Sequence, residues 1–104
     1  MKAIVGEAQT SDAMRVIRRL CKHWSHKYAV QVGKTGGEIQ LPAVKVILRA
    51  DPSRLHVTLE NPLEDIPPRM TGVVGEHLAR MSGDAGFVVK WEADAAVASA
   101  SPDA

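Results

Sequence analysis

Residues 13–24, AMRVIRRLCKHW, carry an apolar side chain at every third or fourth position. This spacing is typical of a helix with one buried face. Thr10, Ser11 and Asp12 come directly before it, and their side chains can accept hydrogen bonds from the first free N–H groups of a helix. We therefore expect a half-buried helix over residues 13–24. Its core-facing side chains are predicted to be Ala13, Val16, Ile17, Leu20, Cys21 and Trp24.

Strands are expected on both sides of this helix. Residues 3–9 are rich in apolar side chains, and from residue 28 the apolar period changes from about 3.6 residues to about 2. Gly36 and Gly37 can take positive φ, which permits a tight turn into residues 38–41. A second hairpin joins residues 44–49 to residues 55–60 through a turn at residues 51–54. Pro42 cannot donate to a ladder, so it marks an edge, a bulge or a break between two short strands.

A second helix is expected to begin near Pro68 and to end at Gly83. Gly72 and Gly75 weaken this helix and can let a neighbouring backbone approach closely. Residues 87–91 alternate again and predict a final strand. The apolar stripe of the second helix consists of Met70, Val73, Val74, His77, Leu78 and Met81.

The element order β-α-β-β-β-β-α-β, joined mostly by short turns, favours an α+β fold. We expect a two-layer sandwich, in which a mostly antiparallel sheet carries both helices on one face. Residues 1–92 are predicted to form a single domain, and residues 93–104 a flexible, Ala-rich C-terminal tail.

Composition sets broad limits on function. The chain has 104 residues, of which 45% are hydrophobic and 24% charged, as in a globular domain and unlike a disordered or collagen-like chain. A net charge of +1 gives no global attraction to nucleic acid or to a membrane, so neither is an expected partner. A single cysteine, the absence of an export signal and the lack of an apolar run of ~20 residues predict a cytoplasmic protein.

A thiol and two imidazoles, those of Cys21, His23 and His26, lie within six residues and suggest metal binding. At about 100° per residue, however, Cys21 points roughly 140° away from His26 and about 160° away from His23. One regular helix cannot bring all three to one ion. His77, in the stripe of the second helix, is the best further ligand, so His23 and His77 are the predicted metal pair. A haem is a related alternative.

A purely structural interpretation of the same residues remains open. Cys21 can be a small buried hydrophobe, His77 a core histidine bonded to a backbone carbonyl, and His26 a solvated side chain. A catalytic Cys-His pair is disfavoured because Cys21 lies on the packed face of its helix and no third residue orients the imidazole. The sequence contains no phosphate loop, dinucleotide fingerprint or paired-carboxylate signature. Together these features favour a noncatalytic protein.

Charge is concentrated on the first helix, where residues 11–27 sum to +4 and the rest of the chain sums to −3. Its basic side chains lie opposite the core stripe, and this surface can receive a phosphate, an anionic siderophore or an acidic partner. An ordinary solvated helix face is the alternative. Besides Cys21, His23, His26 and His77, the candidate ligand-binding residues are therefore Arg15, Arg19 and Lys22.

The sequence resembles a bacterial family called domain of unknown function 2218. The resemblance spans about residues 3–92 and is carried by Thr10, LCKHWSHK at 20–27, GEIQLP at 37–42, VVGEHLAR at 73–80 and Trp91. It implies a small stand-alone bacterial domain whose relatives are sometimes joined to siderophore-interacting, flavin-dependent reductase-like proteins. The resemblance therefore implies an accessory role in the handling of iron, siderophores or metals. The implied ligand is a metal or an iron chelate, and the implied partner is such a reductase.

A competing hypothesis comes from a different functional class. The domain can be an interaction module that docks to a reductase or forms a homodimer through the exposed sheet face. In that case the helix with Cys21, His23 and His26 serves only the structure.

Overall fold

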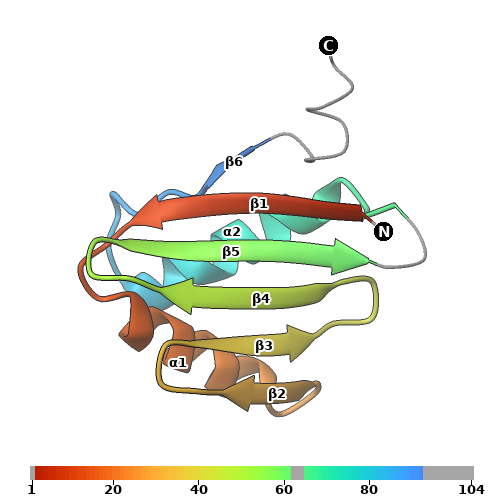
Figure 1. Ribbon diagram of the computed structural model, residues 1–104, viewed down its shortest axis with the longest axis horizontal. Helices are drawn as coiled ribbons and strands as arrows, with labels where there is room; N and C mark the ends of the chain where they lie inside the picture. The colour runs from red at the N-terminus through yellow and green to blue at the C-terminus, as the bar shows by residue number, and fades with distance from the viewer. Residues whose placement is uncertain (1, 62–64, 93–104) are drawn as a thin grey trace.

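The computed structural model describes residues 2–61 and 65–92. Six strands form one sheet in the order β2-β3-β4-β5-β1-β6, and every neighbouring pair is antiparallel. Both helices cover the same face of this sheet (Figure 1). The predicted α+β two-layer architecture is therefore confirmed. The elements in chain order are β1 (Lys2–Gln9), α1 (Ala13–Trp24), β2 (Ala29–Val32), β3 (Gly36–Gln40), β4 (Lys45–Ala50), β5 (Arg54–Asn61), α2 (Arg69–Ser82) and β6 (Lys90–Trp91). The predicted tail at 93–104 lies outside the described residues.

The core lies between the sheet and the two helices. All six side chains predicted for the inner face of α1 are buried, because the 3.6-residue period keeps them on one side. Ile17 and Leu20 are fully buried, and each such side chain stabilises the fold by roughly 1.5–3 kcal/mol. On α2, Val74 and Leu78 are fully buried. His77 is half-buried, so α2 leaves one margin of its stripe partly open to solvent.

The turn between β2 and β3 differs from the sequence prediction. Gly36 and Gly37 do not take positive φ, and Gly83 is the one described residue with that conformation. Both glycines belong to β3, where space decides their identity. A Cβ at Gly36 would overlap the carbonyl oxygen of Leu48, and a Cβ at Gly37 would lie 2.9 Å from the Sγ atom of Cys21. Close packing, against the backbone of β4 at Gly36 and against α1 at Gly37, requires glycine here rather than turn geometry.

The predicted start of α1 is confirmed in part: Oγ1 of Thr10 accepts a hydrogen bond from the backbone N–H of Asp12 over 3.1 Å. Asp12 occupies the N-cap position of α1 but makes no side-chain capping bond; its carboxylate instead accepts a hydrogen bond from Nε of Arg15. At the end of α2, Gly83 has φ of 68° and donates its N–H to the carbonyl of Arg80, as expected for a helix-ending glycine.

Two further details refine the prediction. The final strand is limited to Lys90–Trp91, which pairs with β1 at Gly6 and Glu7. Pro42 lies in the break between β3 and β4, one of the three positions expected for it. No helix within residues 2–61 and 65–92 has both the length and the apolar character needed to span a membrane.

Candidate functional site

A groove lies where the end of α1, the outer margin of α2 and the loop between β3 and β4 meet. We call it the aromatic groove. Its volume is about 350 Å³. Apolar and aromatic walls with a few polar groups are typical of small-molecule sites. It is lined by Trp24, Tyr28, Leu41, Pro42, Ala43, Arg69, Met70, Val73 and His77.

His77 is oriented by its own helix. Its Nδ1 atom lies 2.7 Å from the carbonyl oxygen of Val73, one turn earlier. A carbonyl oxygen can only accept, so Nδ1 carries the proton and donates, which leaves Nε2 with a lone pair in the neutral ring. Imidazoles that ligate metals almost always have their second nitrogen held in this way. The same bond also satisfies the alternative prediction of a core histidine bonded to a backbone carbonyl.

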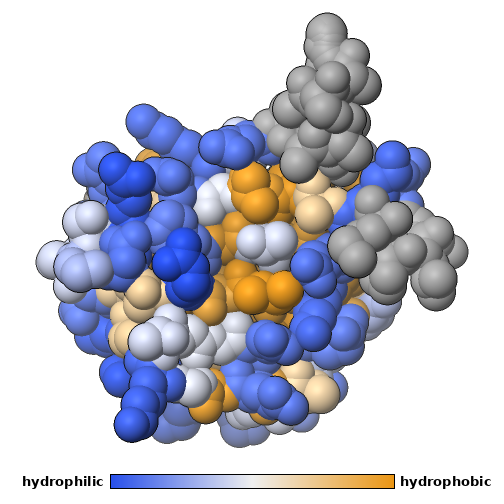
Figure 2. All heavy atoms as spheres, viewed as in Figure 1, coloured by the Kyte–Doolittle hydropathy of each residue, from blue (hydrophilic) through white to orange (hydrophobic). Residues whose placement is uncertain are grey.

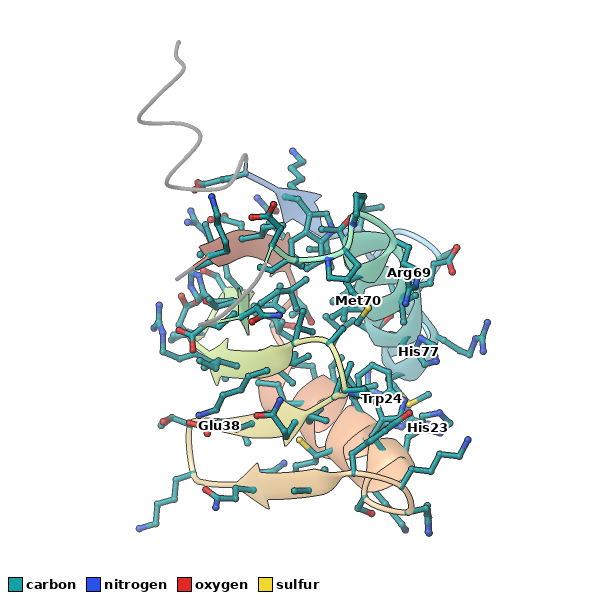
Figure 3. All side chains as sticks on the ribbon, turned by 90° about the vertical axis from the view of Figure 1, so that its right-hand side faces the viewer. His23, Trp24, Glu38, Arg69, Met70 and His77 are labelled. Atoms are coloured by element: carbon teal, nitrogen blue, oxygen red, sulfur yellow. The ribbon has the colours of Figure 1, made fainter. Side chains whose placement is uncertain are left out.

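His23 lies beside His77 at the edge of the helix layer. Their ring centres are 5.7 Å apart, and the ring centre of Trp24 is 4.9 Å from that of His77. Figure 3 shows the three side chains on the same side of the molecule, with His23 and Trp24 on α1 and His77 on α2. An ion ~2.1 Å from each of two nitrogens, which themselves lie about 1 Å from their ring centres, places the ring centres at most about 6.2 Å apart when the two bonds are collinear and about 5 Å apart when the N–metal–N angle is tetrahedral. The observed 5.7 Å lies between these values, so a shared tetrahedral ion requires the two rings to move slightly closer.

Cys21 and His26, the other two candidate ligands near the end of α1, do not join the pair of His23 and His77. Cys21 is 1% exposed in the core, and burial raises the pKa of its thiol. Since the thiolate is both the nucleophile and the metal ligand, this environment suits packing rather than chemistry. His26 is exposed and makes no ring contact within the described part of the chain. Among residues 2–61 and 65–92, no group of three or more His, Cys, Asp or Glu could hold a metal ion.

The cations predicted on α1 are in two different situations. Arg15 donates to Asp12 and, over 3.1 Å, to the carbonyl of Ser82, so it ties the start of α1 to the end of α2. Arg19 and Lys22 are exposed, and their side chains have no hydrogen bond or ion pair to the described residues. They belong to a solvated face that is free to meet an anion.

Sequence reasoning did not find most of the groove. Tyr28 comes after the end of α1, yet its ring meets that of Trp24 edge-on at 6.4 Å, and the four-residue spacing was the available signal. Arg69 supplies the cation of the groove from the first turn of α2 (Figure 3). No local pattern placed the loop 41–43 against these residues.

Comparison with known proteins assigns the family. The profile of the family described as "Uncharacterized protein conserved in bacteria (DUF2218)" matches residues 5–92. The chain belongs to this family. A solved structure described as "NMR structure of PA4090 from Pseudomonas aeruginosa" is similar to the chain, with 32% sequence identity and a TM-score of 0.72. The match covers 89% of this chain and 97% of that chain. No curated protein matches the sequence. The DUF2218 description assigns no activity and no ligand.

Proposed function

We propose that this domain is a noncatalytic binding domain that holds a metal chelate, of the ferric-siderophore type, at the end of the aromatic groove where His77, which lines it, meets the exposed His23. The observation that carries the proposal is the pairing of His23 with His77, whose ring centres lie 5.7 Å apart. The ligand is inferred from the two imidazole donors, and the bacterial family and the fold are compatible with it.

The donor set fits a chelated ion better than a bare one. Two imidazoles fill half of a tetrahedral site, and the described residues offer no third His, Cys, Asp or Glu nearby. A chelator that leaves two coordination positions open would let His23 and His77 complete the shell. Imidazole nitrogen is a suitable ligand for iron, copper, nickel and zinc.

The surroundings also suit an organic chelate. The rings of Trp24 and Tyr28 form an apolar wall, and Arg69 adds positive charge at the other end of the groove. Many chelates carry net negative charge from their carboxylate or phenolate oxygens, which a guanidinium favours. A flavin-dependent reductase of the siderophore-interacting class would then be the partner that acts on the held chelate.

Copper(II) nitrilotriacetate is the probe that tests this arrangement, because this anionic complex leaves positions for two protein nitrogens. In electron paramagnetic resonance we expect the full-length chain to show coupling to two imidazole nitrogens. The fluorescence of Trp24, which contacts His77, should be quenched on titration. Ferric nitrilotriacetate should compete for the same site.

Three variants separate the proposed ligands from a neighbouring imidazole. His23→Ala and His77→Ala should each weaken chelate binding by about tenfold or more, the effect of losing over 1.4 kcal/mol of binding free energy. His26→Ala is the matched control, since it removes an exposed imidazole three residues from His23 and should leave binding unchanged. Equal loss in all three variants, or binding that persists without both His23 and His77, would overturn the proposal and favour the structural role of the helix.

A further inference from the structure

The face of the sheet opposite the helices carries a second, independent feature. Alternation along the strands places Glu7 on β1, His56 on β5 and Arg49 on β4 in one cross-strand row, and Val5, Thr58 and Ile47 in the next. All six line one shallow hollow of about 300 Å³. Figure 2 shows apolar side chains near the middle of this face, ringed by hydrophilic ones. We call these six residues the open-face patch.

Charge on the open-face patch is incompletely matched within one chain. Glu7 pairs with Arg54 at 3.4 Å, and His56 bonds to Asp51 at 2.6 Å. The guanidinium of Arg49 makes no hydrogen bond or ion pair with residues 2–61 or 65–92. Arg49 and Glu7 are two strands apart, or roughly 10 Å, so they do not meet directly.

We infer that the open-face patch is the interface of a two-fold homodimer. Stacking two sheets face to face, with the two-fold axis along β5, places β1 of one copy over β4 of the other. Glu7 then faces Arg49 of the second copy, twice by symmetry, and Val5 faces Ile47. The arrangement is self-complementary, and it gives Arg49 the carboxylate that its own chain does not provide.

The competing two-fold axis is less favourable. An axis across the strands, through Val5, Thr58 and Ile47, would place Arg49 over Lys45 of the second copy, which brings like charges together. The axis along β5 also places Arg54 and Glu60, the charged ends of the open face of β5, over their own copies. Each like-charge pair has an opposite charge beside it, since Glu7 lies 3.4 Å from Arg54 and Lys45 is the cross-strand neighbour of Glu60.

The size of the face suits a dimer. The eight residues of β1 and β5 span about 27 Å, and six strands span about 24 Å, but the other four strands are shorter, which gives a projected face of roughly 540 Å². A stable interface covers about 800 Å² of accessible surface per partner. Because side chains protrude from the sheet, the solvent-accessible area of this face is larger than its projected area. Charged side chains around a small apolar centre match the usual anatomy of such an interface.

Charge exchange tests the inference on the full-length chain. Light scattering should report twice the monomer mass at high protein concentration. Glu7→Arg and Arg49→Glu each create a like-charge pair across the interface and should weaken self-association by about tenfold or more. The double variant restores opposite charges and should recover dimerisation. Arg18→Glu, on the exposed side of α1, lowers the net charge by the same amount as Arg49→Glu and should leave the dimer intact.

The outcomes are unambiguous once circular dichroism shows that each variant is folded. A chain that stays monomeric at all accessible concentrations overturns the inference. So does a dimer that Arg49→Glu leaves unchanged, or a double variant that associates as poorly as the single ones. Recovery in the double variant supports the axis along β5, because the axis across the strands does not bring residues 7 and 49 together.

Discussion

Two glycine-to-alanine substitutions, one inside α2 and one at its C-cap, should change stability in opposite directions, although the chemical change is the same. Gly72 lies inside the helix, and an added Cβ would meet nothing within 4 Å. Alanine there removes the entropic cost of glycine in a helix interior, about 0.8–1 kcal/mol. For a domain of this size we therefore expect Gly72→Ala to raise the Tm by about 4–8 °C.

Gly83 ends the same helix with φ of 68°, where an added Cβ again meets no neighbour. Space is therefore equal at the two sites, and backbone conformation alone differs. An L side chain in the left-handed region costs ~1–2 kcal/mol, so Gly83→Ala should lower the Tm by about 4 °C or more.

Thermal unfolding followed by far-UV circular dichroism, with urea titration as a second measure, compares both variants with the parent chain. A fall in Tm for Gly72→Ala would refute the placement of residue 72 in an open part of the helix. A rise for Gly83→Ala would refute the left-handed helix end. Either result would show that α2 is not bounded as the structure describes.

Three other perturbations follow from the contacts described. Leu78→Ala removes a fully buried side chain and should cost about 2–5 kcal/mol, measured by urea denaturation. Arg15→Ala removes the bond to the carbonyl of Ser82 and should cost about 0.5–1.5 kcal/mol, while chelate binding stays at the parent level. Hydrogen bonds from His56 and then from the backbone of Ser53 lower the pKa of Asp51 from 3.8 to about 2. Because a lowered pKa stabilises the fold above the unfolded value, the Tm difference between the parent and Asp51→Asn should be full above about pH 4 and disappear as the pH falls toward 2.

The parts of the fold that depend on local period were predictable from the sequence. The stripe of α1, from Ala13 to Trp24, was complete because every third or fourth residue carries the pattern and no Gly or Pro interrupts it. The error at Gly36 and Gly37 has a different origin. Their identity depends on Leu48 and Cys21, which approach from elements that a local pattern does not place. The requirement for glycine at these two positions was therefore attributed to turn geometry, whereas it comes from packing.

The candidate site also has one part that could be predicted from the sequence and one part that could not. His23 and His77 could be paired in advance because His23 lies at the margin of the first stripe, His77 lies within the second, and both stripes face one sheet. The aromatic groove could not be predicted, since its walls come from three segments whose meeting depends on the sheet order. Asp51 and His56 were also missed; the turn at 51–54 was recognised, but only the structure shows that the carboxylate reaches back to the imidazole.

Ligand binding and self-association can be judged separately because they use opposite sides of the sheet. The aromatic groove lies in the helix layer, whereas the open-face patch lies on the uncovered face (Figure 1). A dimer stacked through the open faces would leave both helix layers outermost, with each groove still open to solvent. A change at Arg49 therefore has no contact through which to alter the imidazole pair, and loss of His23 removes nothing from the dimer interface. If the two assays nevertheless respond to the same substitution, a change in the whole fold, rather than either site, is the physical explanation.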